Sequence, residues 1–411
     1  MKKLLIIFTF VLILSAAMYS HIYFSTGLQK HLISTGVENF SQHGKSSLLN
    51  ELNVSGVSGY RINTKPVVSP AGGGLNAGLN NGLNNTELCR RIWRYSFVCA
   101  LEYALNDSSI EKVLPLARKL EGRTVQDCVW NVLAWEGKNL KYNWSKATLN
   151  PTVIEYFWSG NGAGNGIENV KIVRKGIWYQ TPQETVEKGN GICGDYAILT
   201  SALLADMNIT PYPVLVNFTT GTGHAAVLVK IEGWYFVLDQ HLPPMDLGAY
   251  YREWKYYRKA TFGSRTIKNL HVYVVKPGVK RAELRDLGII DAKEMLRQDY
   301  RITSKDLEAL SYSVMQEFEK VGLTPDPALK DLKPGSYLPV GYTSGRYWTF
   351  TFPHYADYYN PVFFNQYSRY FFSHIYSGSA KIDAESCNRV WVRAEVNGSN
   401  LVFHVLLAKY G

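Results

Sequence analysis

Charged residues are scarce in this 411-residue sequence. They make up 19% of the chain, against 46% hydrophobic residues, and 28 Tyr, 17 Phe and 10 Trp are present. This composition excludes an intrinsically disordered protein, because disordered chains have too little apolar surface to bury. No internal repeat is visible, and the length is sufficient for two domains. We therefore expect a folded protein with more than one domain.

Cysteines are also few, and none of them forms a CxxC pair. The sequence contains five, Cys89, Cys99, Cys128, Cys193 and Cys387. Their spacing does not suit structural zinc, and we expect no metal and no cofactor. Cys89 and Cys99 would be about 15 Å apart on one continuous helix, which is beyond disulfide reach. A pairing such as Cys99–Cys128 stays open, and Cys193 is the natural candidate for a thiol left unpaired.

The N-terminus has the features of a targeting segment. Lys2 and Lys3 precede the apolar run LLIIFTFVLIL (4–14). The apolar character continues through residues 1–24, which is about the length needed to span a bilayer, whereas Ser-Ala-Ala at 15–17 offers a signal-peptide cleavage site. Both interpretations export the rest of the chain. We favour an uncleaved single-pass anchor with the lysines on the cytoplasmic side; a cleaved signal would give a secreted protein.

Residues 25–86 are rich in Gly, Asn and Ser, as in SPAGGGLNAGLNNGLNN (69–85). Such a composition predicts a flexible tether. Asn-x-Ser/Thr acceptors are compatible with an exported glycoprotein at the cell surface. They occur at Asn39, Asn53, Asn84, Asn106, Asn143, Asn208, Asn217 and Asn397.

Positive charge is concentrated in residues 252–285, where ten Lys and Arg residues face only Glu253 and Glu283, a net charge of +8. Such a segment could contact anionic lipid, acidic polymer or nucleic acid. It carries no nucleic-acid-binding motif, so we expect no nucleic-acid partner. We interpret the segment as a solvated face of the protein.

Cys193 occupies a position typical of a nucleophile. In TPQETVEKGNGICGDYAILTSALLAD (181–206) it follows a Gly-rich turn and opens a run in which Leu199, Leu203 and Leu204 recur at helical spacing. The first turn of a helix has unpaired backbone N–H groups and the positive end of the dipole, which favour an anion. A thiol placed there is biased toward the reactive thiolate.

A predicted hairpin supplies partners for this thiol. Two strand-like runs, GTGHAAVLVKI and WYFVLDQH, flank Glu232-Gly233, which is typical of a two-residue hairpin turn. With that turn, His224 lies diagonally beside Asp239 on one face, within side-chain reach. A one-residue slip would send the two to opposite faces. Cys193, His224 and Asp239 would then be nucleophile, base and orienting acid.

Each of these three residues alone is more often structural than catalytic. A histidine on a strand is commonly a satisfied core or surface residue, and an aspartate at a strand end commonly forms a turn. The three in this order, with a Gly-rich turn before the helix and a hairpin after it, favour a catalytic site.

The segments WYQTPQET, GNGICGDYAILTSALL, GHAAVLV and GWYFVLDQH resemble the transglutaminase-like superfamily of cysteine enzymes, and its exported or membrane-associated microbial members in particular. The resemblance covers about residues 120–245. It implies a papain-like α+β fold, in which a helix bearing the nucleophile packs on an antiparallel sheet. It also implies catalytic roles for Cys193, His224 and Asp239. The family pattern often has an acidic residue directly after the cysteine, whereas here Gly194 intervenes before Asp195.

The remaining segments complete a predicted domain plan. We expect the catalytic domain, with preceding helices, over residues 87–280, including one helix over 87–105 and another over Thr124–Lys138. Residues 281–411 are predicted to contain a charged helical segment over 281–330 and then a β-rich C-terminal accessory domain. The Tyr-rich stretch 240–260 could form a wall of the cleft.

These features predict an extracytoplasmic cysteine hydrolase that cleaves peptide or amide bonds through a thioester acyl-enzyme. Its partners would be a protein or peptide substrate and the membrane. The backbone N–H of Cys193 would contribute to an oxyanion hole, with Gln180 or Trp178 as candidates for a second contact to the substrate. Two alternatives stay open: a transglutaminase that transfers the acyl group to amines, and a non-catalytic surface-binding module.

Overall fold

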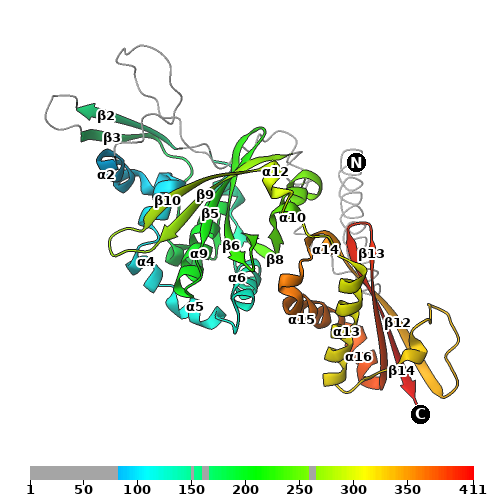
Figure 1. The fold of residues 1–411 in the computed structure, drawn as a ribbon. Helices are drawn as coiled ribbons and strands as arrows, with labels where there is room; N and C mark the ends of the chain where they lie inside the picture. The colour runs from blue at the N-terminus through cyan, green and yellow to red at the C-terminus, as the bar shows by residue number, and fades with distance from the viewer. Residues whose placement is uncertain (1–81, 150–151, 160–165, 259–264) are drawn as a thin grey trace, which may run out of the picture. The chain divides into compact units, whose positions relative to one another are not determined.

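The computed structural model describes residues 82–149, 152–159, 166–258 and 265–411 (Figure 1). The predicted anchor over 1–24 and most of the predicted tether over 25–86 lie outside these residues. No helix in the described part of the chain is long and apolar enough to cross a bilayer. The chain divides into two compact units between Tyr300 and Arg301.

The first unit begins with short helices where we expected one continuous helix over 87–105. They are α2 (Gly82–Ile92), the 3-10 turn η1 (Trp93–Tyr95) and α3 (Phe97–Tyr103). Ser96 is extended, and its side chain accepts a hydrogen bond from the backbone N–H of Cys99, so it ends one helix and caps the next. Because of this break, the Cα atoms of Cys89 and Cys99 are 5.0 Å apart and their sulfurs form a disulfide. The expectation that this pair is out of reach is therefore wrong, and the Cys99–Cys128 pairing is excluded.

Further helices follow, namely α4 (Asp107–Glu111), α5 (Leu114–Leu120) and α6 (Val125–Asn139). Thr124 caps α6 by accepting a hydrogen bond from the backbone N–H of Asp127. The helix predicted over Thr124–Lys138 is confirmed. Two small elements, β1 (Lys141–Tyr142) and α7 (Trp144–Ala147), come next, and then a two-stranded ribbon of β2 (Val153–Ser159) and β3 (Gly166–Arg174).

The centre of this unit is an antiparallel six-stranded sheet with strand order β10-β9-β5-β6-β7-β8. Its strands are β5 (Tyr212–Phe218), β6 (Gly221–Ile231), β7 (Trp234–Asp239), β8 (His241–Asp246), β9 (Ile267–Lys276) and β10 (Glu283–Asp291). Glu232 and Gly233 both have positive φ angles, 52° and 85°, as a tight primed turn between twisted strands requires. Ile231 pairs with Trp234, so the predicted register is confirmed.

Helix α9 (Cys193–Asp206) is the core helix of the unit. It follows α8 (Pro182–Lys188) and the short strand β4 (Asn190–Gly191). The sheet strands β5 and β6 contact one side, and helices α3 to α6 and α8 contact the others. Figure 1 shows α4, α5 and α6 around α9. Every residue from Cys193 to Leu204 is buried. We expected one buried face; the helix is instead enclosed on all sides, which explains its nearly uninterrupted apolar sequence.

The predicted helical stretch after residue 281 begins instead with strand β10. Glu283–Asp291 pairs with β9 in an antiparallel register that shifts between Asp286 and Gly288, where Gly288 has a φ of 88°. The extra residue and the left-handed glycine mark a β-bulge. Cross-strand pairing with the preceding strand thus overrides the local helical pattern. The unit also contains α10 (Leu247–Arg252), the π-helical turn η2 (Glu253–Tyr257) and α12 (Ala292–Met295).

The second unit, from Arg301 onward, contains a four-stranded sheet with strand order β11-β13-β14-β12 and several helices. Its strands β12 (Tyr342–Phe352), β13 (Arg389–Asn397) and β14 (Asn400–Tyr410) coincide with the strand-like runs of the sequence. One sheet face packs on helices, through Phe318, Phe371 and Phe403. The other elements are α13 (Ser304–Lys320), β11 (Thr324–Pro325), η3 (Pro327–Leu329), α14 (Tyr355–Tyr358), η4 (Pro361–Phe363), α15 (Phe364–Ile375) and α16 (Gly378–Ser386).

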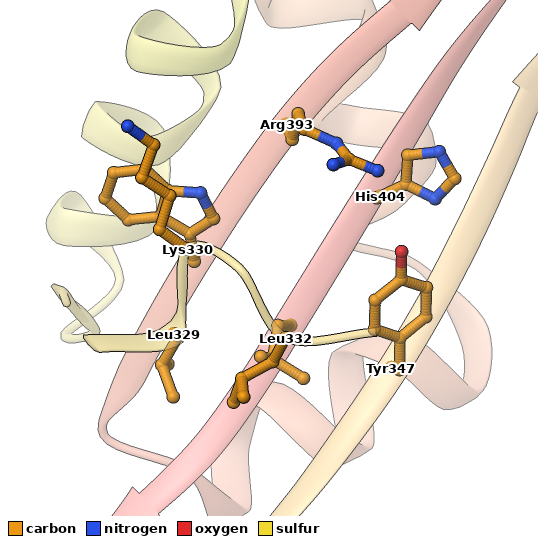
Figure 2. Close-up of a pocket in the computed structure, with 8 residues that line it drawn as sticks. Leu329, Lys330, Leu332, Tyr347, Arg393 and His404 are labelled. Carbon is orange, nitrogen blue, oxygen red and sulfur yellow. The ribbon is translucent and has the colours of Figure 1, made fainter. Parts of the chain in front are cut away.

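A hollow lies on the other face of this C-terminal sheet. Figure 2 shows Tyr347, Arg393 and His404 projecting from neighbouring strands, beside a chain segment that carries Leu329, Lys330 and Leu332. The hollow contains none of the residues that the sequence nominates for catalysis.

Candidate active site

Cys193 is the first residue of α9 and is 1% exposed. The family pattern often has an acidic residue directly after the cysteine, whereas this chain has Gly194 there. A Cβ atom at residue 194 would lie 2.4 Å from the ring of Tyr179, so any side chain there would clash. The acidic residue therefore comes one position later, at Asp195, where it can fold back over the helix start.

His224 and Asp239 meet as the hairpin register predicts. The distance between His224 Nε2 and Asp239 Oδ1 is 2.8 Å, and both side chains are buried. An electrostatic interaction also links the imidazole of His224 to Cys193. Since Nε2 is engaged by the carboxylate, Nδ1 is the ring nitrogen left to exchange a proton with the thiol. The structure thus brings the three predicted residues together from α9, β6 and β7.

The charged side chains of this site stabilise one another. Burial alone would lower the pKa of His224, but the charges of Asp239 and Cys193 and the hydrogen bond to Asp239 raise that pKa to about 9. Burial alone would raise the pKa of Asp239, yet the charges of His224 and Arg258 hold it well below its usual value. A protonated His224 beside an ionised Asp239 is therefore the favoured state of this pair at neutral pH.

A buried ion pair holds the start of α9. Lys146 Nζ lies 2.5 Å from Asp195 Oδ2, and the two side chains are 2% and 0% exposed. Asp195 also accepts hydrogen bonds from the backbone N–H groups of Ile192, at 2.9 Å, and Gln180, at 2.8 Å. Burial lowers the pKa of Lys146 and raises that of Asp195, while their mutual attraction opposes both shifts. One carboxylate thus pins the segment before the helix, the helix start and α7.

The two candidates for a second substrate contact have different surroundings. The side-chain amide of Gln180 is buried and donates a hydrogen bond to the backbone oxygen of Asn190, at 2.9 Å. This amide is therefore committed to holding the turn before Cys193. The ring of Trp178 is 37% exposed and lies 4.9 Å from Lys146 Nζ. Trp178 thus keeps a surface that a substrate could contact.

Tyr142 is a residue of the site that the sequence did not nominate. Strand β1 pairs in parallel with β4, which sets Tyr142 beside Gly191, and the tyrosine side chain interacts electrostatically with Cys193. Burial, followed by the negative charge of Cys193, raises the pKa of Tyr142 well above its usual value, so its hydroxyl stays protonated. The stretch KYNW carries no signal for this contact, because pairing with residues almost 50 positions away creates it.

The basic segment 252–285 is not the uniformly solvated face that we expected. Arg252 is buried and paired with Asp299, and Arg258, 11% exposed, pairs with both Asp239 and Glu253. Arg281 contacts Glu102. Part of the local excess of positive charge is therefore balanced by carboxylates distant in sequence, which counting charges along the chain cannot reveal. Among the residues that the structure describes, no group of three His, Cys, Asp or Glu side chains could hold a metal ion.

The chain is similar to several known proteins. A family model for a transglutaminase-like domain matches residues 111–273. A UPF0252 protein of Archaeoglobus fulgidus is 35% identical over 291 residues, which is 71% of this chain and 81% of that protein. A UPF0252 protein of Pyrococcus furiosus is 26% identical over 311 residues, 75% of this chain and 83% of the relative. The solved structure of Legionella pneumophila LapG is similar at 12% identity, with a TM-score of 0.19, over 40% of this chain and 87% of LapG.

The matched region spans α6, α9 and strands β5 to β8, with the helix that begins at Cys193 packed on an antiparallel sheet. The match with the Archaeoglobus relative extends beyond it to most of both chains. This chain therefore belongs to the UPF0252 family, and its core is a transglutaminase-like domain with a papain-like α+β fold.

Proposed function

We propose that this protein is an extracytoplasmic cysteine hydrolase that cleaves peptide or amide bonds, with Cys193 as nucleophile. The observation that carries the proposal is the buried His224–Asp239 pair, with 2.8 Å between Nε2 and Oδ1, whose imidazole also interacts electrostatically with Cys193 at the start of α9. A thiol, an imidazole and a carboxylate in series are the elements of nucleophilic catalysis by cysteine.

The reaction follows from these contacts. With the thiol proton already held by His224 as an imidazolium, the Cys193 thiolate sulfur attacks the substrate carbonyl carbon to form a C–S bond. The imidazolium then donates the proton to the leaving nitrogen as the C–N bond breaks, which releases an amine and leaves a thioester. Water attacks the thioester, His224 accepts its proton, and breakage of the C–S bond releases a carboxylic acid and restores the thiol. Asp239 stays ionised throughout.

The negative oxygen of each tetrahedral intermediate needs hydrogen-bond donors. The backbone N–H of Cys193 lies in the first turn of α9, where helix geometry leaves it without an intrahelical partner. The Tyr142 hydroxyl, beside the sulfur and protonated, is a better second donor than the committed amide of Gln180. Trp178 is assigned to substrate contact.

Two features support action outside the cytoplasm. The apolar run at 4–14 follows Lys2 and Lys3, and the Cys89–Cys99 disulfide is the kind of bond that persists in oxidising compartments. The proposal includes the membrane as a partner through residues 1–24. Mass spectrometry of the mature protein distinguishes an anchor from a cleaved signal, and a cytoplasmic pool containing the full chain would contradict export.

The test is a library of internally quenched peptides, assayed with and without a fluorescent primary amine. We expect the wild-type protein to release free carboxylic acids and Cys193→Ala to lose at least about 10³-fold of the rate. Cys387→Ala, which removes a free thiol in the other unit, is the matched control and should keep the activity. Hydrolysis at the wild-type rate by the Cys193→Ala variant would show that Cys193 is not the nucleophile. Amine-coupled products in excess over acids would instead assign a transglutaminase.

A further inference from the structure

The helical segment after β8 turns one side toward the His224–Asp239 pair. It consists of α10, the π-helical turn η2 and the residue that caps η2, Arg258, so that Tyr250, Trp254 and Arg258 recur along it at intervals of four residues. In a regular α-helix such a row drifts by about 80° over eight residues, since each residue turns about 100°. Here the backbone N–H of Arg258 bonds to the carbonyl of Glu253, five residues back. This wider turn brings Arg258 back toward the face of the other two, and π-helical turns are frequent at functional sites.

All three side chains contact the pair. The Tyr250 hydroxyl donates to Asp239 Oδ2 at 3.2 Å, and Arg258 Nη2 lies 3.1 Å from the same oxygen. The ring of Trp254 meets the ring of His224 edge-on, with centroids 4.9 Å apart. Oδ1 of Asp239 faces His224, whereas Oδ2 is held from the helix. The orientation of this carboxylate is therefore fixed from both ends.

Contacts with Trp254 and Glu253 hold the Arg258 side chain in place. Its guanidinium lies 4.6 Å from the centre of the Trp254 ring, and its Nε donates to Glu253 Oε1 at 2.9 Å. The pair with Glu253 alone would satisfy the charge of an arginine. A second nitrogen of the planar guanidinium also reaches Asp239. The single ammonium group of a lysine could not contact both carboxylates in this way.

We propose that Arg258 is a positioning residue of this site, which together with Tyr250 locks the Asp239 carboxylate against His224. The inference rests on the proposed hydrolase function and extends it to a residue that touches neither the nucleophile nor a substrate. Charged or titratable groups surround this network from each packed element. They are Asp239 from β7, Glu253 and Tyr250 from the helical segment, His241 from β8, His224 from β6, Cys193 from α9, Tyr142 from β1 and Glu136 from α6.

The experiment compares Arg258→Met, Arg258→Lys and Tyr250→Phe with the wild-type protein. Arg297→Met is the matched control, because Arg297 is an exposed arginine paired with Glu294 in the same unit. The first readout is the NMR titration of the His224 imidazole in histidine-labelled full-length protein, assigned with His224→Gln. The second is the split between kcat and KM for a peptide that the wild-type protein hydrolyses.

Arg258→Met removes a positive charge beside the imidazole, so His224 should keep its proton to higher pH, with a midpoint roughly half a unit or more above that of the wild type. Because a freed carboxylate no longer orients the imidazole, kcat should fall about 10- to 100-fold with KM unchanged. Arg258→Lys should keep the wild-type midpoint and lose less of kcat. Tyr250→Phe should lower kcat alone, and Arg297→Met should change nothing.

A wild-type midpoint and a kcat within about twofold of wild type in folded Arg258→Met would overturn the proposal. If that variant does not fold, wild-type kcat in both Arg258→Lys and Tyr250→Phe overturns it, and lowered kcat at constant KM supports it. If the wild-type protein hydrolyses no peptide, the hydrolase proposal fails by itself. The His224 midpoints then decide alone whether Arg258 controls the pair.

Discussion

Glu136 is a carboxyl group that the fold keeps protonated. It is fully buried on α6, where Thr200 donates a hydrogen bond to one oxygen at 2.6 Å, and the other oxygen has no partner among the described residues. Burial raises its pKa to about 8, Thr200 opposes that shift, and the charge of Asp239 adds to it. Because this carboxyl group is neutral, it places no unpaired negative charge near Asp239, which is itself paired with His224 and Arg258.

The raised pKa has a consequence for stability. Below the ordinary pKa of 4.5, folded and unfolded chains both hold the proton, and no stability is lost. As pH rises from there to about 8, only the folded state keeps the proton, so the free energy of unfolding falls by about 1.4 kcal/mol per pH unit. Glu136→Gln should remove this contribution and make the protein more stable at pH 8 than the wild type.

Chemical unfolding at pH 5, 6.5 and 8 measures the difference. Glu121→Gln is the matched control, since Glu121 is an exposed glutamate shortly before the same helix. A wild-type and a Glu136→Gln protein that lose stability in parallel between pH 5 and 8 would show that Glu136 is already ionised in the folded state.

At the scale of elements, α7 is tied to α9 by Lys146 and Asp195. These residues are 49 positions apart, and the segment around Lys146, KYNWSKATLN, has the composition of an exposed turn. No local pattern marks this lysine as buried. The predicted helix start at Cys193 and the hairpin register depended on short-range turn chemistry, whereas this contact depends on the parallel pairing of β1 with β4. Sequence periodicity could predict the former but not the latter.

Breaking the pair on one side should be costly. Lys146→Met leaves the Asp195 charge buried without its cation, and we expect a loss of about 3–5 kcal/mol in the free energy of unfolding. Adding Asp195→Asn removes that charge, while the amide oxygen can still accept a backbone hydrogen bond, so the double variant should recover part of the loss. Urea unfolding followed by tryptophan fluorescence measures both variants.

Arg297→Met serves as the exposed comparison, because surface pairs such as Arg297–Glu294 contribute at most about 1 kcal/mol. The account of the ion pair would be contradicted by a Lys146→Met protein as stable as the wild type. A double variant less stable than Lys146→Met would contradict it as well.

At the scale of the whole molecule, the sequence predicted what local signals govern. The helix that begins at Cys193, the Glu232-Gly233 hairpin and the three long C-terminal strands lie where the patterns indicated. The failures involve contacts that the periodicity of a single segment does not encode. The helix break at Ser96 permits the Cys89–Cys99 disulfide, pairing with β9 makes Glu283–Asp291 a strand, and Asp299 and Asp239 form ion pairs with Arg252 and Arg258.

The protein has three free thiols in different surroundings, so their reactivities can be compared within one molecule. Cys193 and Cys128 are buried, whereas Cys387 is partly exposed. Burial raises the pKa of the Cys387 thiol, with the nearby charge of Asp383 adding to the shift and Ser386 opposing it. Simple access therefore favours reaction at Cys387, whereas contact with His224 and the helix start favours reaction at Cys193.

The most direct test of the account is the rate of iodoacetamide modification at each thiol at pH 7, measured by peptide mass spectrometry on the folded protein. The account predicts that Cys193 reacts about tenfold or more faster than Cys387, and that His224→Ala removes this preference. If the rates instead follow exposure, with Cys387 modified first and Cys193 protected as well as Cys128, then Cys193 is a structural cysteine and the proposed nucleophile is wrong.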